Sequence, residues 1–163
     1  HLFLNVLPNV GELFAVEDVS DSLLAKRLIE LNLSSSQIVM ELVELDAKCE
    51  NNLKLAANSL ADNGFKIAID DFGSNASTVN RVKLIAPHII KIDRSLMLEF
   101  EQGDSEKIEV ALSLAKKMNA KTVIEGIETP DQLNAMQSLG FDMYQGYHLA
   151  MPEKINLNTQ QTG

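Results

Sequence analysis

Short apolar runs alternate with amphipathic stretches six times along this 163-residue chain, and the alternation limits the folds open to it. Each apolar run has the length of a strand and no regular polar face, which is typical of strands buried on both sides. Parallel strands joined by crossover helices account for such a pattern. The predicted strands are Leu2–Val6, Ile38–Glu44, Lys66–Asp71, Ile89–Asp93, Thr122–Ile127 and Met143–Tyr147.

Capping residues and helical spacing predict helices between these strands. The first begins at Ser20 or Ser22, either of which can accept a hydrogen bond from the first turn, and it reaches about Leu31. The second ends at Asn63-Gly64, a common helix stop. The remaining helices run from Ser77 to Ile85, from Asp104 to Met118, and from Thr129-Pro130 to Gly140.

Two α/β architectures have this order of elements: an open doubly wound sheet and a barrel of eight strand–helix units. A doubly wound sheet normally has a glycine-rich phosphate loop after its first strand, and the chain contains no such sequence. We therefore predict a TIM-barrel-like (β/α)8 fold with about six units present. A complete barrel needs roughly 200 residues or more, so we expect its first strands upstream of His1. The domain is predicted to cover residues 1–155, and the polar tail 156–163 is expected to fray.

Charge and cysteine content exclude several classes of function. With 14 basic and 23 acidic residues, the formal charge of −9 argues against a basic surface for long nucleic acids. No apolar run approaches the roughly 20 residues that span a bilayer. The single cysteine, Cys49, excludes a disulfide within the chain and suits a reducing compartment. We therefore expect a cytoplasmic domain that binds no nucleic-acid polymer and contains no membrane segment, whether or not its parent protein is membrane-anchored.

Every predicted strand has a polar residue at or near its carboxyl end. The carboxyl ends of parallel barrel strands share one rim, where residues far apart in sequence meet and barrel enzymes carry their active sites. The adjacent pair Asp70-Asp71 is the most unusual, although such a pair taken alone is more often a solvated turn. The predicted rim residues are Asn5, Glu41, Asp70, Asp71, Lys91, Glu125 and Gln145.

Most of these side chains are hard oxygen donors, without clustered cysteine or histidine, which favours Mg²⁺ or Mn²⁺ over Zn²⁺. Carboxylates gathered at one point repel each other unless cations neutralise them, so we predict a pair of divalent ions bridged by Asp70. Such a pair suits in-line displacement at a phosphodiester. Lys91 would hold the attacking water or a phosphate oxygen, and Glu125 would accept the proton. The alternative for each residue singly is an ordinary buried ion pair, such as Lys91 with Asp93 or Glu125.

Short motifs around these residues form a specific set, although each alone is weak. They are Asn5-Val6, Glu41-Leu42-Val43-Glu44, Asp70-Asp71-Phe72-Gly73, Lys91-Ile92-Asp93, Glu125-Gly126-Ile127-Glu128-Thr129 and Gln145-Gly146-Tyr147. In order and spacing this set resembles the EAL domain, the cyclic-di-GMP phosphodiesterase family. The resemblance runs from Leu4 to Pro152 and corresponds to the C-terminal two thirds or so of that domain.

The resemblance implies a (β/α)8-like barrel that hydrolyses cyclic-di-GMP to linear pGpG with Mg²⁺ or Mn²⁺, two ions per complete site. Glu125 would match the general base, and Lys91 the residue at the attacking water. The family also implies a homodimer, and the parent chain is compatible with flanking sensor or GGDEF domains. The implied metal ligands are Asn5, Glu41, Asp70 and Asp71, with Asp70 shared by both ions. The implied supporting residues are Glu44, Asp93, Glu128 and Gln145.

Three features depart from the family pattern. The signature Glu-Ala-Leu segment, whose glutamate completes the first metal site, would lie before His1. The loop after Asp71 usually reads Phe-Gly-Thr-Gly-Tyr-Ser-Ser but here is Phe72-Gly73-Ser74-Asn75-Ala76-Ser77-Thr78, and Ile124 stands where alanine is usual.

These departures leave alternatives open. The main one is a degenerate, inactive EAL domain that acts as a cyclic-di-GMP receptor or a protein-interaction module. A more distant one is a barrel that abstracts a proton next to a carboxylate, with Lys91 as the base. For the 163-residue chain alone we expect little or no turnover, because it would lack a ligand and expose strand edges.

Overall fold

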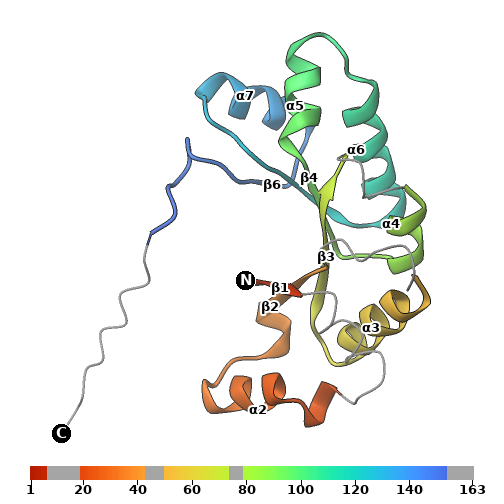
Figure 1. Ribbon diagram of the computed structural model, residues 1–163. Helices are drawn as coiled ribbons and strands as arrows, with labels where there is room; N and C mark the ends of the chain where they lie inside the picture. The colour runs from red at the N-terminus through yellow and green to blue at the C-terminus, as the bar shows by residue number, and fades with distance from the viewer. Residues whose placement is uncertain (7–18, 43–49, 74–78, 154–163) are drawn as a thin grey trace, which may run out of the picture.

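A single sheet of six parallel strands runs through the computed structural model, which describes residues 1–6, 19–42, 50–73 and 79–153 (Figure 1). Neighbouring strands in the sheet are also neighbours in the sequence, from β1 to β6. A doubly wound sheet reverses its strand order part-way, whereas a barrel keeps it. The predicted α/β class and barrel-type strand order are therefore confirmed. The strands are β1 (Leu2–Val6), β2 (Ile38–Leu42), β3 (Lys66–Phe72), β4 (Ile89–Ile92), β5 (Lys121–Ile124) and β6 (Met143–Tyr144).

The sheet is open rather than closed into a ring. Within the described ranges, β1 pairs with β2 alone and β6 pairs with β5 alone. The structure is thus an arc of a barrel. The predicted tail 156–163, the loop residues Ser74–Thr78, and the positions Glu44 and Cys49 lie outside the described residues.

The α-helices follow the outer side of this arc (Figure 1). Their ends match the capping signals in the sequence: Ser22 accepts a hydrogen bond from the Ala25 amide at 3.2 Å, and Gly140 ends the last helix with φ of 88°. Of the two serines offered as the first cap, Ser22 holds that position. The helices are α2 (Leu23–Glu30), α3 (Glu50–Asp62), α4 (Val79–Ile85), α5 (Arg94–Glu101), α6 (Glu106–Met118) and α7 (Pro130–Leu139), with 3₁₀ turns η1 (Val19–Asp21) and η2 (Ser35–Gln37). None of the described helices is long and apolar enough to cross a membrane.

Helix α5 was not predicted, and it changes the structural environment of Asp93. The fourth strand ends at Ile92 instead of Asp93, and the Asp93 carboxylate accepts a hydrogen bond from the Ser95 amide at 2.9 Å. Asp93 is therefore the N-cap of α5. The helix follows the strand without a loop, so the sequence contains no turn signal that would separate the two elements.

The two faces of the sheet have separate apolar clusters. The outer face packs against the helices through residues such as Met40, Ile69 and Ile92, which share a cluster with Leu60 of α3 and Ile108 of α6. The inner face carries a smaller cluster, which consists of Val39, Ala68, Ile89 and Val123 with Phe3 and Met143 packed against it. Burial on both faces explains why the strands have apolar sequences without strict alternation.

Candidate functional site

The polar residues of the strand ends lie directly above the inner apolar cluster. Side chains two residues apart on a strand point to the same face, so each residue two positions beyond the cluster faces the barrel interior. At all six positions that residue is polar, although Glu125 and Gln145 lie just beyond the last residues of β5 and β6. The layer consists of Asn5, Glu41, Asp70, Lys91, Glu125 and Gln145.

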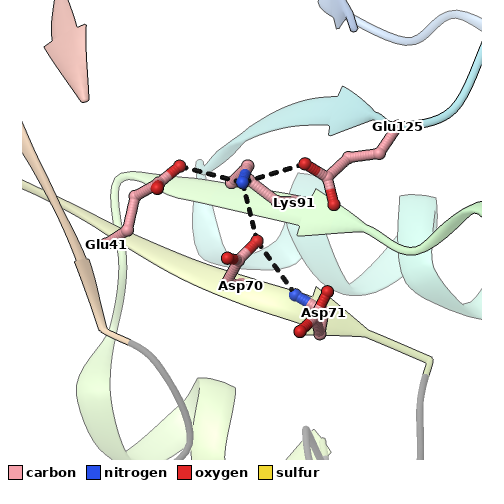
Figure 2. Close-up of polar contacts among 5 residues, drawn as sticks. All are labelled: Glu41, Asp70, Asp71, Lys91 and Glu125. Carbon is pink, nitrogen blue, oxygen red and sulfur yellow. Dashed lines mark hydrogen bonds and ion pairs between the residues drawn. The ribbon is translucent and has the colours of Figure 1, made fainter. Parts of the chain in front are cut away.

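Lys91 is the centre of this polar layer (Figure 2). Its Nζ atom lies 2.9 Å from Oε1 of Glu41, 2.7 Å from Oδ1 of Asp70 and 2.8 Å from Oε1 of Glu125. These carboxylates come from strands β2 and β3 and from the end of β5, and Lys91 itself is 5% exposed. An ammonium group has three N–H donors, and here each faces one carboxylate. The site is therefore a buried charge network rather than a single ion pair.

The network fixes the charge of Lys91. Burial by itself would lower the pKa of its ammonium, but hydrogen bonds to Asp70, Glu125 and Glu41 outweigh burial and raise that pKa. Lys91 is consequently a cation throughout the neutral pH range. A permanently charged lysine can donate hydrogen bonds and attract an anion, but it cannot act as a base at neutral pH.

The pKa of Glu125 is also raised, but for this carboxyl group burial is the cause of the rise. Burial raises the pKa of its carboxyl group, the contact with Lys91 offsets part of that rise, and the negative charges of Asp70 and Asp71 add to it. A carboxylate whose pKa is raised is a stronger proton acceptor than an exposed one. The environment of Glu125 therefore suits a general base.

Asp71 reaches the same site because the backbone of β3 departs from regular strand geometry there. Consecutive side chains of a strand point to opposite faces, so Asp70 and Asp71 would normally separate. The φ angle of Asp71 is +54°, in the left-handed region that Asp tolerates better than most residues. One ligand oxygen from each of Asp70, Asp71 and Glu125 consequently lies within 4.8 Å of the others.

This donor set fits a hard divalent cation. All three members of the cluster are carboxylates, and oxygen ligands of this kind are preferred by Mg²⁺ and Mn²⁺. Glu41 belongs to the same site because its carboxylate contacts Lys91. Asn5 is exposed, and the pairing of β1 with β2 places it next to Glu41. Of the four predicted metal ligands, Asp70 and Asp71 form the tight carboxylate trio together with Glu125, the predicted base, and Glu41 and Asn5 lie beside it.

The predicted supporting residues occupy different places. Asp93 caps α5, as described above, and Glu128 binds the guanidinium of Arg94. The backbone amide of Gln145 donates a hydrogen bond to the Ile124 carbonyl at 2.9 Å. Ile124, one of the departures from the family pattern, is fully buried in the outer core and so faces away from Glu125.

A pocket of about 330 Å³ opens beside Glu125. Two of its lining glycines are sterically required: a Cβ on Gly146 would lie 2.1 Å from the Ile127 carbonyl oxygen, and one on Gly126 would lie 2.6 Å from Cδ of Arg94. The sequence predictions missed Arg94 because its helix was missed, and the Glu-Gly and Gln-Gly pairs were the available signals for the pocket. The lining residues are Asp93, Arg94, Glu125, Gly126, Glu128, Gln145, Gly146 and Tyr147.

Comparison with known protein families identifies the family of the chain. The EAL domain family model matches residues 12–152. The chain belongs to the EAL domain family. This membership confirms the family predicted from the sequence motifs.

Named relatives of this EAL domain are bacterial cyclic-di-GMP enzymes. It is 33% identical over 157 residues to the probable cyclic di-GMP phosphodiesterase PdeN of Escherichia coli K12, covering 90% of the chain. It is 30% identical over 156 residues to the bifunctional diguanylate cyclase/cyclic di-GMP phosphodiesterase MucR of Pseudomonas aeruginosa, covering 93% of the chain. The chain spans 30% of PdeN and 23% of MucR.

Solved structures show the same fold. The PaMucR phosphodiesterase in complex with c-di-GMP superposes with a TM-score of 0.75 at 27% identity, over 94% of this chain and 62% of that one. The Bacillus subtilis YkuI protein, which has an EAL domain, was solved with its substrate c-di-GMP and calcium. It has a TM-score of 0.78 at 26% identity, over 95% of this chain and 38% of that one. These neighbours confirm the TIM-barrel-like fold, of which the present sheet is an open arc.

Proposed function

We propose that this EAL domain binds cyclic-di-GMP and hydrolyses one of its phosphodiester bonds to give linear pGpG. The observation that carries the proposal is the trio Asp70, Asp71 and Glu125, whose ligand oxygens lie within 4.8 Å of one another. The trio lies beside the buried ammonium of Lys91 and a pocket of about 330 Å³. The phosphodiesterase relatives and the YkuI complex with substrate and calcium support the same function.

In this proposal Asn5, Glu41, Asp70 and Asp71 would hold two divalent ions, Mg²⁺ or Mn²⁺. When bound, such ions supply Lewis-acid activation of water and neutralise charge on the phosphate.

Glu125 accepts the proton of the attacking water, because burial raises the pKa of its carboxyl group and makes it a better proton acceptor than an exposed carboxylate. The water oxygen forms a bond to phosphorus while the bond from phosphorus to the ribose 3′ oxygen breaks. The leaving 3′ oxygen takes a proton from solvent, so the product has a 5′ phosphate and a 3′ hydroxyl. Lys91 donates a hydrogen bond to the water or to a phosphate oxygen. The three N–H donors of Lys91 already face carboxylates, so one carboxylate must turn away before Lys91 can donate a hydrogen bond to the substrate.

The alternative function is a receptor that binds cyclic-di-GMP, or a protein partner, without hydrolysis. The sequence Ser74-Asn75-Ala76 favours it, because it lacks the second glycine and the tyrosine that the family usually has in this loop. A receptor needs the pocket and not the base, so Glu125 separates the two functions.

The test is incubation of the protein with cyclic-di-GMP and Mn²⁺, with chromatographic detection of pGpG. It uses the 163-residue chain and any longer natural polypeptide that contains it. We expect product from the longer polypeptide, loss of product in Glu125→Gln, and unchanged turnover in the matched variant Glu30→Gln on the exposed face of α2. Tight binding without product in the wild type would establish the receptor and refute the enzyme.

We further propose that the domain acts in the cytoplasm as a homodimer, with sensor or GGDEF domains flanking it in a parent chain. The name of MucR, which joins a diguanylate cyclase to the phosphodiesterase, supports the last point. Sedimentation of the purified protein tests the dimer, which a single monomeric species at micromolar concentration would refute.

A further inference from the structure

Arg94 is joined to Glu128 by two parallel hydrogen bonds across the pocket. Nη1 lies 2.6 Å from Oε1 and Nη2 lies 2.6 Å from Oε2. Arg94 is the first residue of α5, which continues directly from β4 (Figure 1), whereas Glu128 follows β5. A bidentate pair of this kind fixes orientation as well as distance, because the planar guanidinium matches both carboxylate oxygens.

The aliphatic stem of Arg94 lies against Gly126, the residue next to Glu125. A Cβ built on Gly126 would lie 2.6 Å from Cδ, 2.7 Å from Cγ and 2.8 Å from Cβ of Arg94. The stem therefore occupies the space where a side chain at position 126 would lie. Arg94 thus contacts the segment after β5 at two points, through Gly126 and through Glu128.

That segment carries Glu125 beyond the regular ladder of β5. The Glu125 amide donates to the Ile92 carbonyl at 3.1 Å, and the Glu128 amide donates to Oε1 of Gln132 at 2.8 Å. Between these two anchors, Gly126 has a left-handed φ of +75°, which leaves the backbone freer than another residue would. Ile127 is itself anchored, because its amide donates to the Gln145 carbonyl at 3.0 Å, and Arg94 adds a contact on either side of it, at Gly126 and at Glu128.

The pair is too exposed to be explained by its contribution to global stability. The side chains of Arg94 and Glu128 are 41% and 40% exposed, and ion pairs at such positions contribute little to the stability of the folded state. Both contacts lie close in sequence to the Glu125 carboxylate, at Gly126 one residue away and at Glu128 three residues away.

We propose that Arg94 is a positioning residue that aligns the Glu125 carboxylate with Asp70 and Asp71 through its fork on Glu128 and its stem on Gly126. The proposal rests on the proposed metal-dependent hydrolysis, because it assigns Arg94 to that site. Glu125 is the proposed base, but its ligand oxygen also lies within 4.8 Å of those of Asp70 and Asp71, so a displaced Glu125 carboxylate would weaken cation binding as well as catalysis. Arg94 should therefore affect Mn²⁺ affinity and kcat more than the binding of substrate. Residues that orient a metal site from outside its ligand shell typically change metal affinity or activity by roughly 10–100-fold.

The experiment compares Arg94→Ala, Arg94→Lys and the control Arg27→Ala, which removes an arginine from an exposed ion pair on α2. All variants are made in the longer natural polypeptide used to test the proposed function. Mn²⁺ binding is measured by calorimetry, and kcat and KM are measured with cyclic-di-GMP. We expect Arg94→Ala to lower Mn²⁺ affinity and kcat by roughly tenfold or more, with a smaller change in KM. Arg94→Lys should recover part of both, because it keeps the charge and stem but not the fork, and Arg27→Ala should match the wild type.

A double-mutant cycle with Glu128→Ala tests whether the two residues act together. We expect the double variant Arg94→Ala/Glu128→Ala to lose no more than the worse single variant. Three results would each overturn the proposal. The first is a double variant whose losses in Mn²⁺ affinity and kcat are the product of the two single losses. The others are an Arg94→Ala protein that binds Mn²⁺ as Arg27→Ala does, and a wild type that binds no Mn²⁺. A wild type that binds Mn²⁺ without hydrolysing cyclic-di-GMP would refute only the proposed function, and Mn²⁺ affinity would then decide the role of Arg94.

Discussion

The Nζ atom of Lys91 lies 2.8 Å from Oε1 of Glu125, and the contact alters the two groups unequally. The pKa of Lys91 is raised by its three carboxylate partners, whereas the pKa of Glu125 is raised by burial in spite of the lysine. The one cation of the network therefore leaves uncompensated negative charge at this end of the sheet. Such an arrangement favours the entry of further cations.

Substitution of Lys91 tests how much the folded state depends on this cation. We expect Lys91→Met to lower the free energy of unfolding by about 3–5 kcal/mol, because it leaves Glu41, Asp70 and Glu125 buried without their partner. Urea unfolding in the presence of a chelator measures the loss, and Mg²⁺ or Mn²⁺ should restore part of it.

The matched control is Lys107→Met, which breaks the exposed ion pair between α6 and Glu99. Its effect on unfolding should be small beside that of Lys91→Met, because the two side chains are 59% and 33% exposed and ion pairs at such positions contribute little. Equal losses in the two variants would mean that the network around Lys91 contributes no more than a surface pair.

Replacement of Asp71 separates metal binding from folding. Asn tolerates the left-handed backbone that Asp71 adopts at φ of +54°, so Asp71→Asn should keep the fold while removing one carboxylate from the trio. We expect Mn²⁺ affinity to fall by about tenfold or more, with stability in chelator unchanged or slightly higher. Calorimetric titration checks this, with Asp131→Asn in the exposed first turn of α7 as the control.

Most of the fold could be predicted because its signals are local. Apolar runs located the six strands, and the stop at Gly140 was predicted correctly, as was Ser22 as one of two possible caps. The predicted ends of the last two strands were wrong, because β5 ends at Ile124 instead of Ile127 and β6 at Tyr144 instead of Tyr147. Helix α5 was missed because Asp93 both follows a strand and caps a helix, so no loop residues separate the elements. The open sheet agrees with the prediction of about six strand–helix units, which followed from counting the apolar runs.

The residues of the site were predicted better than their contacts. Their places at the carboxyl ends of predicted parallel strands put Glu41, Asp70 and Lys91 on one rim. The structure adds that each follows an inner apolar residue by two positions. The approach of Asp71 to Glu125 depends on a backbone dihedral angle that strand periodicity does not predict. The pairing of Arg94 with Glu128 joins residues 34 positions apart. Glu128 was predicted as a supporting residue from its motif, but no sequence signal indicated Arg94 as its partner.

Tyr144 provides a pH-dependent test of packing near the site. Burial raises the pKa of its phenol, and the negative charge of Asp142 adds to that rise. The chain has two tyrosines and no tryptophan, so in Tyr147→Phe the absorbance near 295 nm reports Tyr144 alone. We expect a titration midpoint above the ordinary value of about 10.

The sign of the accompanying stability change follows from linkage. The unfolded chain loses the phenolic proton first, so the folded state binds more protons above about pH 10, and the free energy of unfolding falls as pH rises through that window. Below it, Tyr144 makes no pH-dependent contribution. A midpoint at or below 10 would show that the phenol is not held in the buried position, where it donates to the Phe141 carbonyl at 2.6 Å.

Two glycines with similar backbone angles test the steric contact at the pocket. Gly126 and Gly103 have φ of +75° and +93°, but a Cβ on Gly126 would meet Arg94, whereas one on Gly103 would meet nothing within 4 Å. Alanine at either position incurs the left-handed cost of about 1–2 kcal/mol. Gly126→Ala should lower the free energy of unfolding by a further 1–3 kcal/mol or so, the usual cost of overpacking.

Arg94→Ala should relieve part of the Gly126→Ala cost and none of the Gly103→Ala cost, because it removes two of the three atoms that clash. Urea unfolding of the single and double variants measures this coupling. Equal losses in Gly126→Ala and Gly103→Ala would mean that the Arg94 stem moves aside at no cost. In that case the contact between Arg94 and Gly126 could not hold Glu125 in place, and the ion pair with Glu128 would have to align the carboxylate alone.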